Sequence, residues 1–301
     1  MCKLLRSGIR RYTHSITLWL AVIVTICAAV LCGSGARDFY MDDFYAVISL
    51  VADAVMISWL VGREYEEGIF RNKVVSGHSK GKIFLSELIM GVGTCVALYL
   101  LFALIFICFN NYVFGVAPTS VLVKMFIDCL LVHSCFAAIL ITISCLIPHR
   151  AIIGIINVIL VIGLAFASYG VKEVVEQDEY WTEYDYEYVT EVDENGNSHM
   201  VGYAIEGSEH LVKNPNYIGE PFHTVSEILY NILPYGHIAE YTGLTNNWFG
   251  YDYYENWADV KNLSVTNDEN KNININLIYS ISELFMICGI GYYCFRKKEL
   301  K

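Results

Sequence analysis

The sequence predicts an all-α polytopic membrane protein with six transmembrane helices and a small mixed α/β extracellular domain between helices five and six. Two observations predict this fold class. Apolar and aromatic residues make up 55% of the 301 residues and charged residues only 17%, whereas soluble domains are about 25% charged. The apolar residues also come in blocks of about 20, the length that a membrane helix needs.

Six apolar stretches are long enough, or nearly so, to cross a bilayer as helices. The second is the shortest and contains Asp53. A turn at 147–150 separates the fourth stretch from the fifth, because Pro148 breaks a helix. The predicted spans cover about 15–35, 45–62, 84–109, 120–146, 151–170 and 276–295.

The first stretch follows four basic residues, so a signal peptide is an alternative to a retained span. Its apolar run of about 20 residues is long for a signal peptide, whose apolar region has about 7–15. The residues after Cys32 also make a poor cleavage site, so we predict a span. Before it, apolar side chains lie among basic ones and predict a helix along the inner membrane surface. They are Leu4, Leu5, Ile9 and Tyr12.

The distribution of Lys and Arg predicts the orientation, since these residues are enriched in cytoplasmic loops. With the N-terminus inside, the inner segments hold 14 basic residues and the outer segments five. The inner segments are 1–14, 63–83, 147–150 and 296–301, and the outer ones are 36–44, 110–119 and 171–275. Both termini are therefore predicted to be cytoplasmic, with residues 171–275 extracellular.

A step in composition divides the chain. Residues 171–276 hold 20 of the 31 acidic side chains but only four of the 20 basic ones, which gives this segment a net charge of −16. We therefore predict a membrane body over 1–170, an acidic extracellular domain over 171–275, and a sixth span with a basic tail over 276–301. The net charge of −11 for the whole chain argues against nucleic acid as a partner.

The acidic domain shows its own local patterns. Alternation of tyrosine with acidic residues around a turn at 193–197 predicts a β-hairpin over 184–205, with one Tyr/aliphatic face and one acidic face. Apolar residues at helical spacing predict a helix over 222–233. An aromatic cluster follows at 248–257 and suits a membrane interface as well as a packed core. The acidity itself could attract cationic ligands, or could only keep the domain soluble.

The predicted inner loop between spans two and three contains a short amphipathic pattern. Ile69, Phe70 and Val74 lie at helical spacing, and Gly77 ends the pattern. Acidic residues precede this stripe and basic ones follow it, as the helix dipole favours. One interpretation is a helix resting on lipid headgroups. The other is a docking helix whose apolar residues fit a groove in a partner protein.

This loop resembles a segment found in the permease subunits of bacterial type-2 ABC exporters. The family pattern reads acidic-x-Gly-x-x-Arg-Asn-x-x-x-x-Gly-x-Ser/Thr-Arg/Lys. The matching positions here are Glu66, Gly68, Arg71, Asn72, Gly77, Ser79 and Lys80. An Asn-Pro-x-Tyr stretch at 214–217 and a Leu-Pro-x-Gly turn at 233–236 are similar to the same family, whereas residues 171–212 have no counterpart in it.

The resemblance implies a subunit that cannot act alone. The chain has no GxxxxGK[ST] loop and no other catalytic motif, so it is not expected to be an enzyme or to hold a cofactor. ATP and Mg would be bound by a separate cytoplasmic ATPase subunit, and a second permease, identical or paralogous, would complete the pathway through the lipid bilayer. The expected ATPase-coupling residues are Glu66, Glu67, Gly68, Ile69, Phe70, Arg71, Val74 and Gly77.

Four ionisable residues lie inside predicted spans, where charge is costly and often functional. They are Asp53, Asp128, His133 and Glu283. One interpretation is a polar substrate path or a proton relay, and the other is hydrogen bonding between helices. An aspartyl protease dyad of Asp53 and Asp128 would need a Gly-x-Gly-Asp setting that neither has. No metal-ligand spacing such as CxxC occurs.

The sequence therefore predicts the permease half of an ATP-driven exporter. It leaves the substrate open, and a peptide or lipid-like antimicrobial is one candidate. The alternative is a non-transporting receptor or immunity protein that binds a ligand through the acidic domain. The amphipathic loop favours the exporter, because a receptor has no need of a docking helix there.

Overall fold

The computed structural model describes residues 1–34, 42–109, 119–192, 198–205, 207–238, 240–241 and 267–299. The chain forms two compact units. The first, which we call the helical unit, comprises Met1–Tyr169 and Asn231–Lys301, and the second comprises Gly170–Tyr230. Residues 231–241 thus cluster with the helices, although the sequence groups them with the acidic segment.

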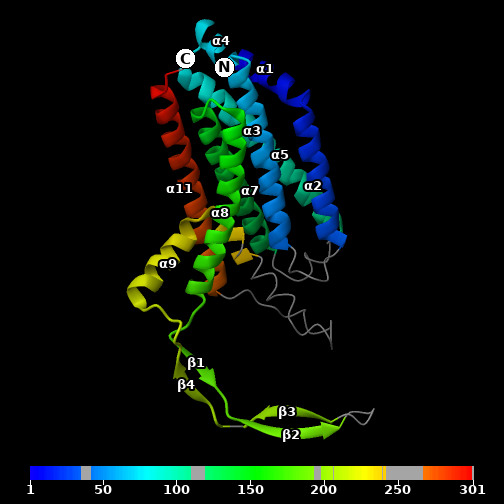
Figure 1. Ribbon diagram of the computed structural model, residues 1–301, viewed down its shortest axis with the longest axis vertical. Coiled ribbons are helices and arrows are strands. Elements are labelled where there is room, and N and C mark those ends of the chain that lie inside the picture. The colour runs from blue at the N-terminus through cyan, green and yellow to red at the C-terminus, as the bar shows by residue number, and fades with distance from the viewer. Residues whose placement is uncertain are drawn as a thin grey trace. The chain divides into compact units, whose positions relative to one another are not determined.

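Each of the six apolar stretches lies in a helix (Figure 1). The helices are α1 (Cys2–Thr13), α2 (Ile16–Ser34), α3 (Asp42–Glu66), α4 (Ile69–Val75), α5 (Lys80–Phe109), α7 (Thr119–Leu146), α8 (Arg150–Val175) and α11 (Asn267–Lys297). Among the described residues, four are long and apolar enough to cross a membrane, namely α5, α7, α8 and residues 272–297 of α11. The prediction of a helical membrane protein is thus confirmed.

By length and composition, the described residues contain fewer candidate spans than the six predicted. The bent pair of α1 and α2, at 64°, counts as a fifth candidate if it is one span. Helix α3 is not among the candidates, and it carries Asp53 together with the charged residues Arg63, Glu64 and Glu66. Six spans with both termini inside therefore remain a prediction.

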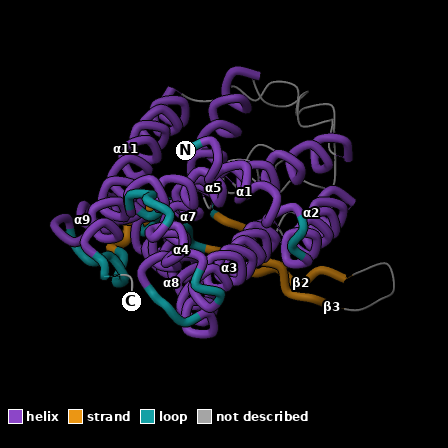
Figure 2. The backbone as a smooth tube through the Cα atoms, turned by 90° about the horizontal axis from the view of Figure 1, so that it is seen from above, coloured by secondary structure: helices purple, strands orange, loops and turns teal. Residues whose placement is uncertain are grey.

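Helix α7 is the centre of the helical unit. Within the most apolar stretch of α7, 67% of the residues are buried inside the protein, against 17% in the same kind of stretch of α5 and 28% in that of α8. It packs on α3, α5 and α11, which stand around it when the bundle is viewed along its axis (Figure 2). The outer helices expose apolar side chains such as Leu104 and Phe166, as helices that face lipid tails do.

One face of helix α1 packs against α5. Leu4 and Tyr12 are buried, and a Cβ added to Gly8 would lie 3.2 Å from Met90 Cγ, so the two helices approach closely. The opposite side of α1 carries exposed basic residues. Helix α1, helix α4 and the C-terminal end of α11 lie at the same end of the bundle (Figure 1), which we call the terminal end.

The second unit contains two antiparallel strand pairs and one helix. Strand β1 (Tyr180–Glu183) pairs with β4 (His210–Lys213), and β2 (Tyr186–Val192) pairs with β3 (Ser198–Ala204). Helix α9 covers Glu220–Ile232. The predicted hairpin and helix are confirmed, whereas the hairpin turn at 193–197 and the aromatic cluster at 248–257 lie outside the described residues.

The register changes the prediction about the hairpin faces. Glu187 pairs with Tyr203, and residues that pair in an antiparallel ladder lie on one face. Tyr203 therefore shares the face of Glu187, and the prediction of a purely acidic face was wrong. The predicted alternation of side chains within each strand was correct. The pairing register between the strands does not follow from this alternation, because it also depends on the length of the turn.

A glycine on α11 tests the helix packing. A Cβ on Gly291 would overlap Thr142 and lie 2.7 Å from Phe84 Cζ, so Gly291→Ala is expected to lower the free energy of unfolding by about 1–3 kcal/mol through overpacking. Gly289→Ala is the matched control, because its Cβ would meet open space. Thermal unfolding of the purified chain in detergent measures both, and equal midpoints for the two variants would contradict this packing.

Candidate functional site

A buried polar cluster joins α7, α11 and the segment 231–241. Its centre is the carboxylate of Asp128, which is 0% exposed. This carboxylate accepts hydrogen bonds from the Tyr241 hydroxyl at 2.6 Å, from Ser280 Oγ at 2.7 Å and from His237 Nδ1 at 3.0 Å. Three donors satisfy a carboxylate that would otherwise be costly to bury. We call these four residues the Asp128 cluster.

The partners of His237 indicate its charge. Its Nε2 lies 2.9 Å from the carbonyl oxygen of Asn231, which can only accept, so Nε2 carries a proton. Its Nδ1 faces the Asp128 carboxylate, so Nδ1 donates as well. Burial opposes this charge, but the hydrogen bond and the attraction of Asp128 outweigh it and raise the pKa of His237. Below its raised pKa, His237 therefore forms a buried ion pair with Asp128.

The cluster contains Ser, His and Asp, but its geometry differs from that of a catalytic triad. In a triad the serine and the aspartate contact opposite ring nitrogens of the histidine. Here Ser280 Oγ lies 3.1 Å from Nδ1, the nitrogen that also faces Asp128. The other nitrogen is occupied by a backbone carbonyl. This arrangement supports binding of the segment 231–241 to the helices, not nucleophilic catalysis.

Glu283 lies one turn after Ser280 on α11 and is 6% exposed. Neither of its carboxylate oxygens has a hydrogen-bond partner among the described residues. Asp128 and His237 are its charged neighbours. Two carboxylates therefore share the neighbourhood of one imidazolium, and Glu283 is the member of this group without a donor in the part of the chain that the structure describes.

The other two candidate residues have different partners. Asp53 of α3 is buried and its partner is the thiol of Cys95 on α5. His133 Nδ1 lies 2.8 Å from the Cys129 carbonyl, and the His133 ring centroid lies 4.5 Å from that of Tyr99. The partners of Asp53 and Asp128 are thus not shared, which gives no support to a protease dyad.

At the terminal end, α4 confirms the predicted short helix between two glycines. Gly68 and Gly77 adopt positive φ angles of 67° and 85°, which other residues rarely adopt, and they bound the helix Ile69–Val75. The predicted role of Phe70 does not hold in this structure. Its side chain is 1% exposed and packs on Tyr65 and Phe295, with ring centroids 4.4 and 5.9 Å away, so it is not free to contact a partner.

A buried ionic network fixes α4 to its neighbours. Lys73 Nζ lies 2.6 Å from Glu64 Oε2 on α3 and 2.5 Å from Glu87 Oε1 on α5. Arg11 of α1 pairs with the other oxygen of Glu64. The network therefore joins four helices with two positive and two negative charges, so the buried charges are balanced.

A second set of contacts joins α11 to the same end. Lys298 Nζ lies 2.6 Å from the Tyr65 hydroxyl and 3.0 Å from the carbonyl oxygen of Cys145. The Tyr65 hydroxyl itself donates to that carbonyl. One carbonyl in the last turn of α7, that of Cys145, is thereby satisfied by side chains from α3 and from the C-terminal segment. The exposed surface left on and beside α4 includes Glu66, Glu67, Arg71, Asn72 and Val75.

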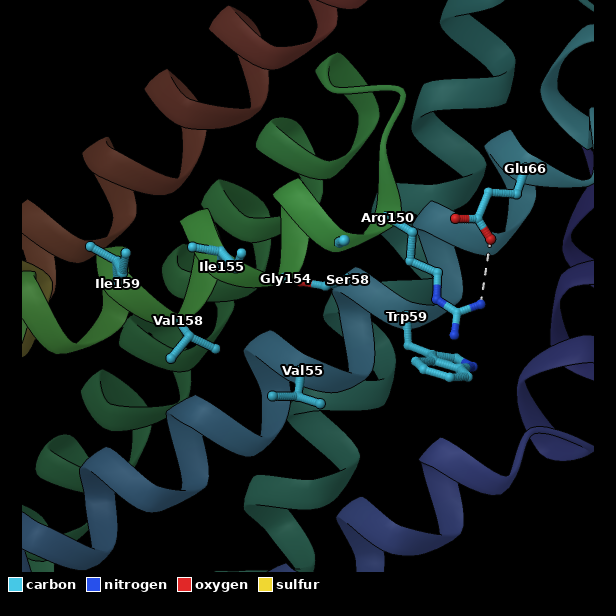
Figure 3. A pocket seen from close by; sticks show the side chains of 10 residues that line it. Val55, Ser58, Trp59, Glu66, Arg150, Gly154, Ile155, Val158 and Ile159 are labelled. Atoms are coloured by element: carbon cyan, nitrogen blue, oxygen red, sulfur yellow. Dashed lines mark hydrogen bonds and ion pairs between the residues drawn. The ribbon is translucent and has the colours of Figure 1, made fainter.

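A groove runs between α3 and α8 and has a volume of about 870 Å³. Figure 3 shows its apolar lining, which includes Val55, Ile155 and Ile159, and its polar end at Arg150. The Arg150 guanidinium lies 3.2 Å from the centroid of the Trp59 ring and 3.5 Å from a Glu66 oxygen. The groove is thus an apolar surface that ends at the Arg150–Glu66 ion pair.

A buried polar residue in the interior of α8 also holds this helix beside the groove. Asn157 is buried and donates to Ser58 Oγ on α3 and to Ser144 Oγ on α7, both at 2.9 Å. Hydrogen bonds of this kind between helices contribute about 0.6 kcal/mol on average in a membrane protein.

Comparison of this chain with family models, with curated proteins and with solved structures finds no match. Its class therefore rests on the fold and on these sites: a helical membrane protein with a buried ionic network at one end and a buried Asp–His cluster between helices. Among the described residues, no group of three or more His, Cys, Asp or Glu side chains could hold a metal ion.

Removing Lys73 tests the ionic network. Lys73→Met leaves Glu87 buried without its cation, so the free energy of unfolding is expected to fall by about 3–5 kcal/mol. The double variant Lys73→Met/Glu87→Gln keeps the Arg11–Glu64 pair and removes the unpaired charge, so it is expected to recover most of this loss. Chemical denaturation in detergent measures both, and a double variant less stable than Lys73→Met would disprove the assignment.

The raised pKa of His237 predicts a pH-dependent stability. The contribution of its ion pair is complete below the unfolded pKa of about 6.5 and is lost as the pH rises through the higher folded pKa. The thermal midpoint in detergent should therefore fall above about pH 6.5, and His237→Gln should reduce this slope. His78→Gln is the control, and a slope unchanged in His237→Gln would refute the ion pair.

Proposed function

We propose that this chain is the permease subunit of an ATP-driven exporter and forms the membrane pathway with a second permease. The observation that carries the proposal is the attachment of α4. A helix of seven residues is fixed to α3 and α5 by the buried Lys73 network and by Phe70. A force on its exposed side would therefore be transmitted to both long helices.

The exposed side of α4 would be the docking surface for a cytoplasmic ATPase subunit, which would bind ATP and Mg. Phe70 supports this surface from behind, and the contact itself would be made by Arg71, Asn72 and Val75, with Glu66 and Glu67 beside them. Val75 is 79% exposed, so its side chain is available for such a contact.

The groove between α3 and α8 would face the second permease and would form part of the pathway. It exposes apolar side chains along its length and ends at Arg150. Such a lining suits a mainly apolar substrate, for example a lipid-like antimicrobial. The six-span topology, with cytoplasmic termini and an outer acidic segment, belongs to the same proposal.

A receptor or immunity protein is the second candidate, and the second unit favours it. The unit Gly170–Tyr230 contains 14 acidic and two basic residues. Its strand pair β2–β3 exposes Tyr186, Tyr188 and Tyr203 to solvent. An acidic, aromatic surface suits a cationic peptide as ligand. The proposed exporter and this receptor differ in whether an ATPase is bound.

Co-purification of an ATPase tests the proposal. The tagged full chain would be isolated from its native membranes in mild detergent, beside the double variant Arg71→Glu/Val75→Asp. The expected result is a stoichiometric ATPase with the wild type and at least about a tenfold reduction with the variant, because loss of a central contact costs about 2 kcal/mol or more.

Two controls make the result specific. Lys213→Glu reverses a charge on the second unit and should leave the co-purified ATPase unchanged. The thermal midpoints of all variants should equal that of the wild type, because the altered side chains are exposed. A folded wild-type chain that binds no ATPase would reject the permease and direct the search to ligands of the second unit.

A further inference from the structure

A second cavity lies at the terminal end, between the last turn of α1 and the end of α3. Its volume is about 420 Å³, within the range of about 300–1,000 Å³ that is usual for ligand sites. Three arginines and a histidine contribute to its lining, which also contains two glutamates and three apolar or aromatic residues. The lining is Arg10, Arg11, Tyr12, His14, Leu60, Arg63, Glu64, Glu67 and Ile69.

The charges in this cavity do not cancel. Arg11 pairs with Glu64, whose charge is shared with Lys73. Arg63 pairs with Glu67 at 2.5 Å, and both side chains are about half exposed, so this pair is weak. The guanidinium of Arg10 has no ion-pair or hydrogen-bond partner in the ranges that the structure describes. The cavity therefore has one unmatched cation, and Arg63 is a second that an anion could recruit.

The position of the cavity indicates where its ligand comes from. Helix α1 is bent by 64° from α2, so it leaves the direction of the span just beside the cavity. Two residues after His14, α2 begins an exposed apolar stripe at helical spacing, which includes Ile16, Trp19 and Ile23. Trp19 also donates its ring N–H to the Thr13 carbonyl. A basic cavity directly before an exposed apolar stripe lies at the boundary between headgroups and acyl chains.

We propose that this cavity binds the phosphate of an anionic phospholipid from the leaflet at the terminal end. Arg10 would donate two hydrogen bonds to the phosphate oxygens, the pairing for which guanidinium geometry is suited. Arg63 would turn from Glu67 toward the same phosphate, and the acyl chains would follow the stripe on α2. A net positive site favours an anionic lipid over a zwitterionic one, because the headgroup of a zwitterionic lipid carries its own positive charge, which the site would repel.

The test uses the full chain in detergent, after removal of bound lipid, with phosphatidylglycerol as the probe and native mass spectrometry as the readout. Loss of a charged hydrogen-bond donor predicts about tenfold weaker binding for Arg10→Gln. Arg6→Gln is the matched control, since Arg6 is exposed on the same helix but does not line the cavity. Glu67→Gln should strengthen binding by releasing Arg63.

The other outcomes each overturn the proposal. Equal losses in Arg6→Gln and Arg10→Gln would show a diffuse basic surface instead of a site. Equal binding of phosphatidylcholine, or of glycerol phosphate without acyl chains, would exclude an anionic lipid. A variant Arg10→Gln that binds phosphatidylglycerol as tightly as the wild type would show that this cation does not hold the lipid. The experiment needs no ATPase, so its failure is distinct from failure of the proposed function.

Discussion

Buried charge is the constraint on which this bundle depends. A charged group removed from water is tolerated only when partners satisfy it, and these helices bury Asp128, Lys73, Glu64 and Glu87 almost completely. Each of the four is held by residues from other helices. Apolar packing alone is a weak guide to helix placement in lipid, because lipid tails are as apolar as the side chains. The ionic contacts therefore specify which helices meet.

The two clusters act on different parts of the bundle. The Lys73 network and Lys298 join α1, α3, α4, α5 and α11 at the terminal end. The Asp128 cluster joins α7 and α11 to the segment 231–241 farther along these helices. Helix α11 takes part in both, so it connects the terminal end with the segment that follows α9. Helix α8 is held by the neutral Asn157, by the contacts of Arg150 with Glu66 and Trp59, and by apolar contacts.

The sequence predicted the helices well, because apolar blocks and breakers such as Pro148 act locally. The glycines at 68 and 77 likewise gave the limits of α4. The direction of α4 could not be predicted, since an apolar stripe shows that one side is covered but not by what. The stripe therefore predicts Phe70 as a docking residue, whereas Phe295 of the same chain covers it. The position of Asp128 inside a span makes it a candidate from the sequence. Its hydrogen-bond partners lie 109 to 152 residues away along the chain. Among them only His237 lies beside a recognisable motif, the Leu-Pro-x-Gly turn.

The distribution of these contacts limits how the proposed permease could move. If an ATPase pulls on α4, the network at Lys73 requires α3 and α5 to follow, because separating its charges would leave them buried and unpaired. The seam between α3 and α8 is closed by a hydrogen bond from Asn157 to Ser58 and by the partly exposed Arg150–Glu66 pair, and each of these contributes little. Movement would thus open at this seam before it breaks the ionic network, and the apolar groove with Arg150 at its end already lies there. The end of α3 contributes Glu66 both to the docking surface and to this groove, so α3 would couple the docking helix to the pathway.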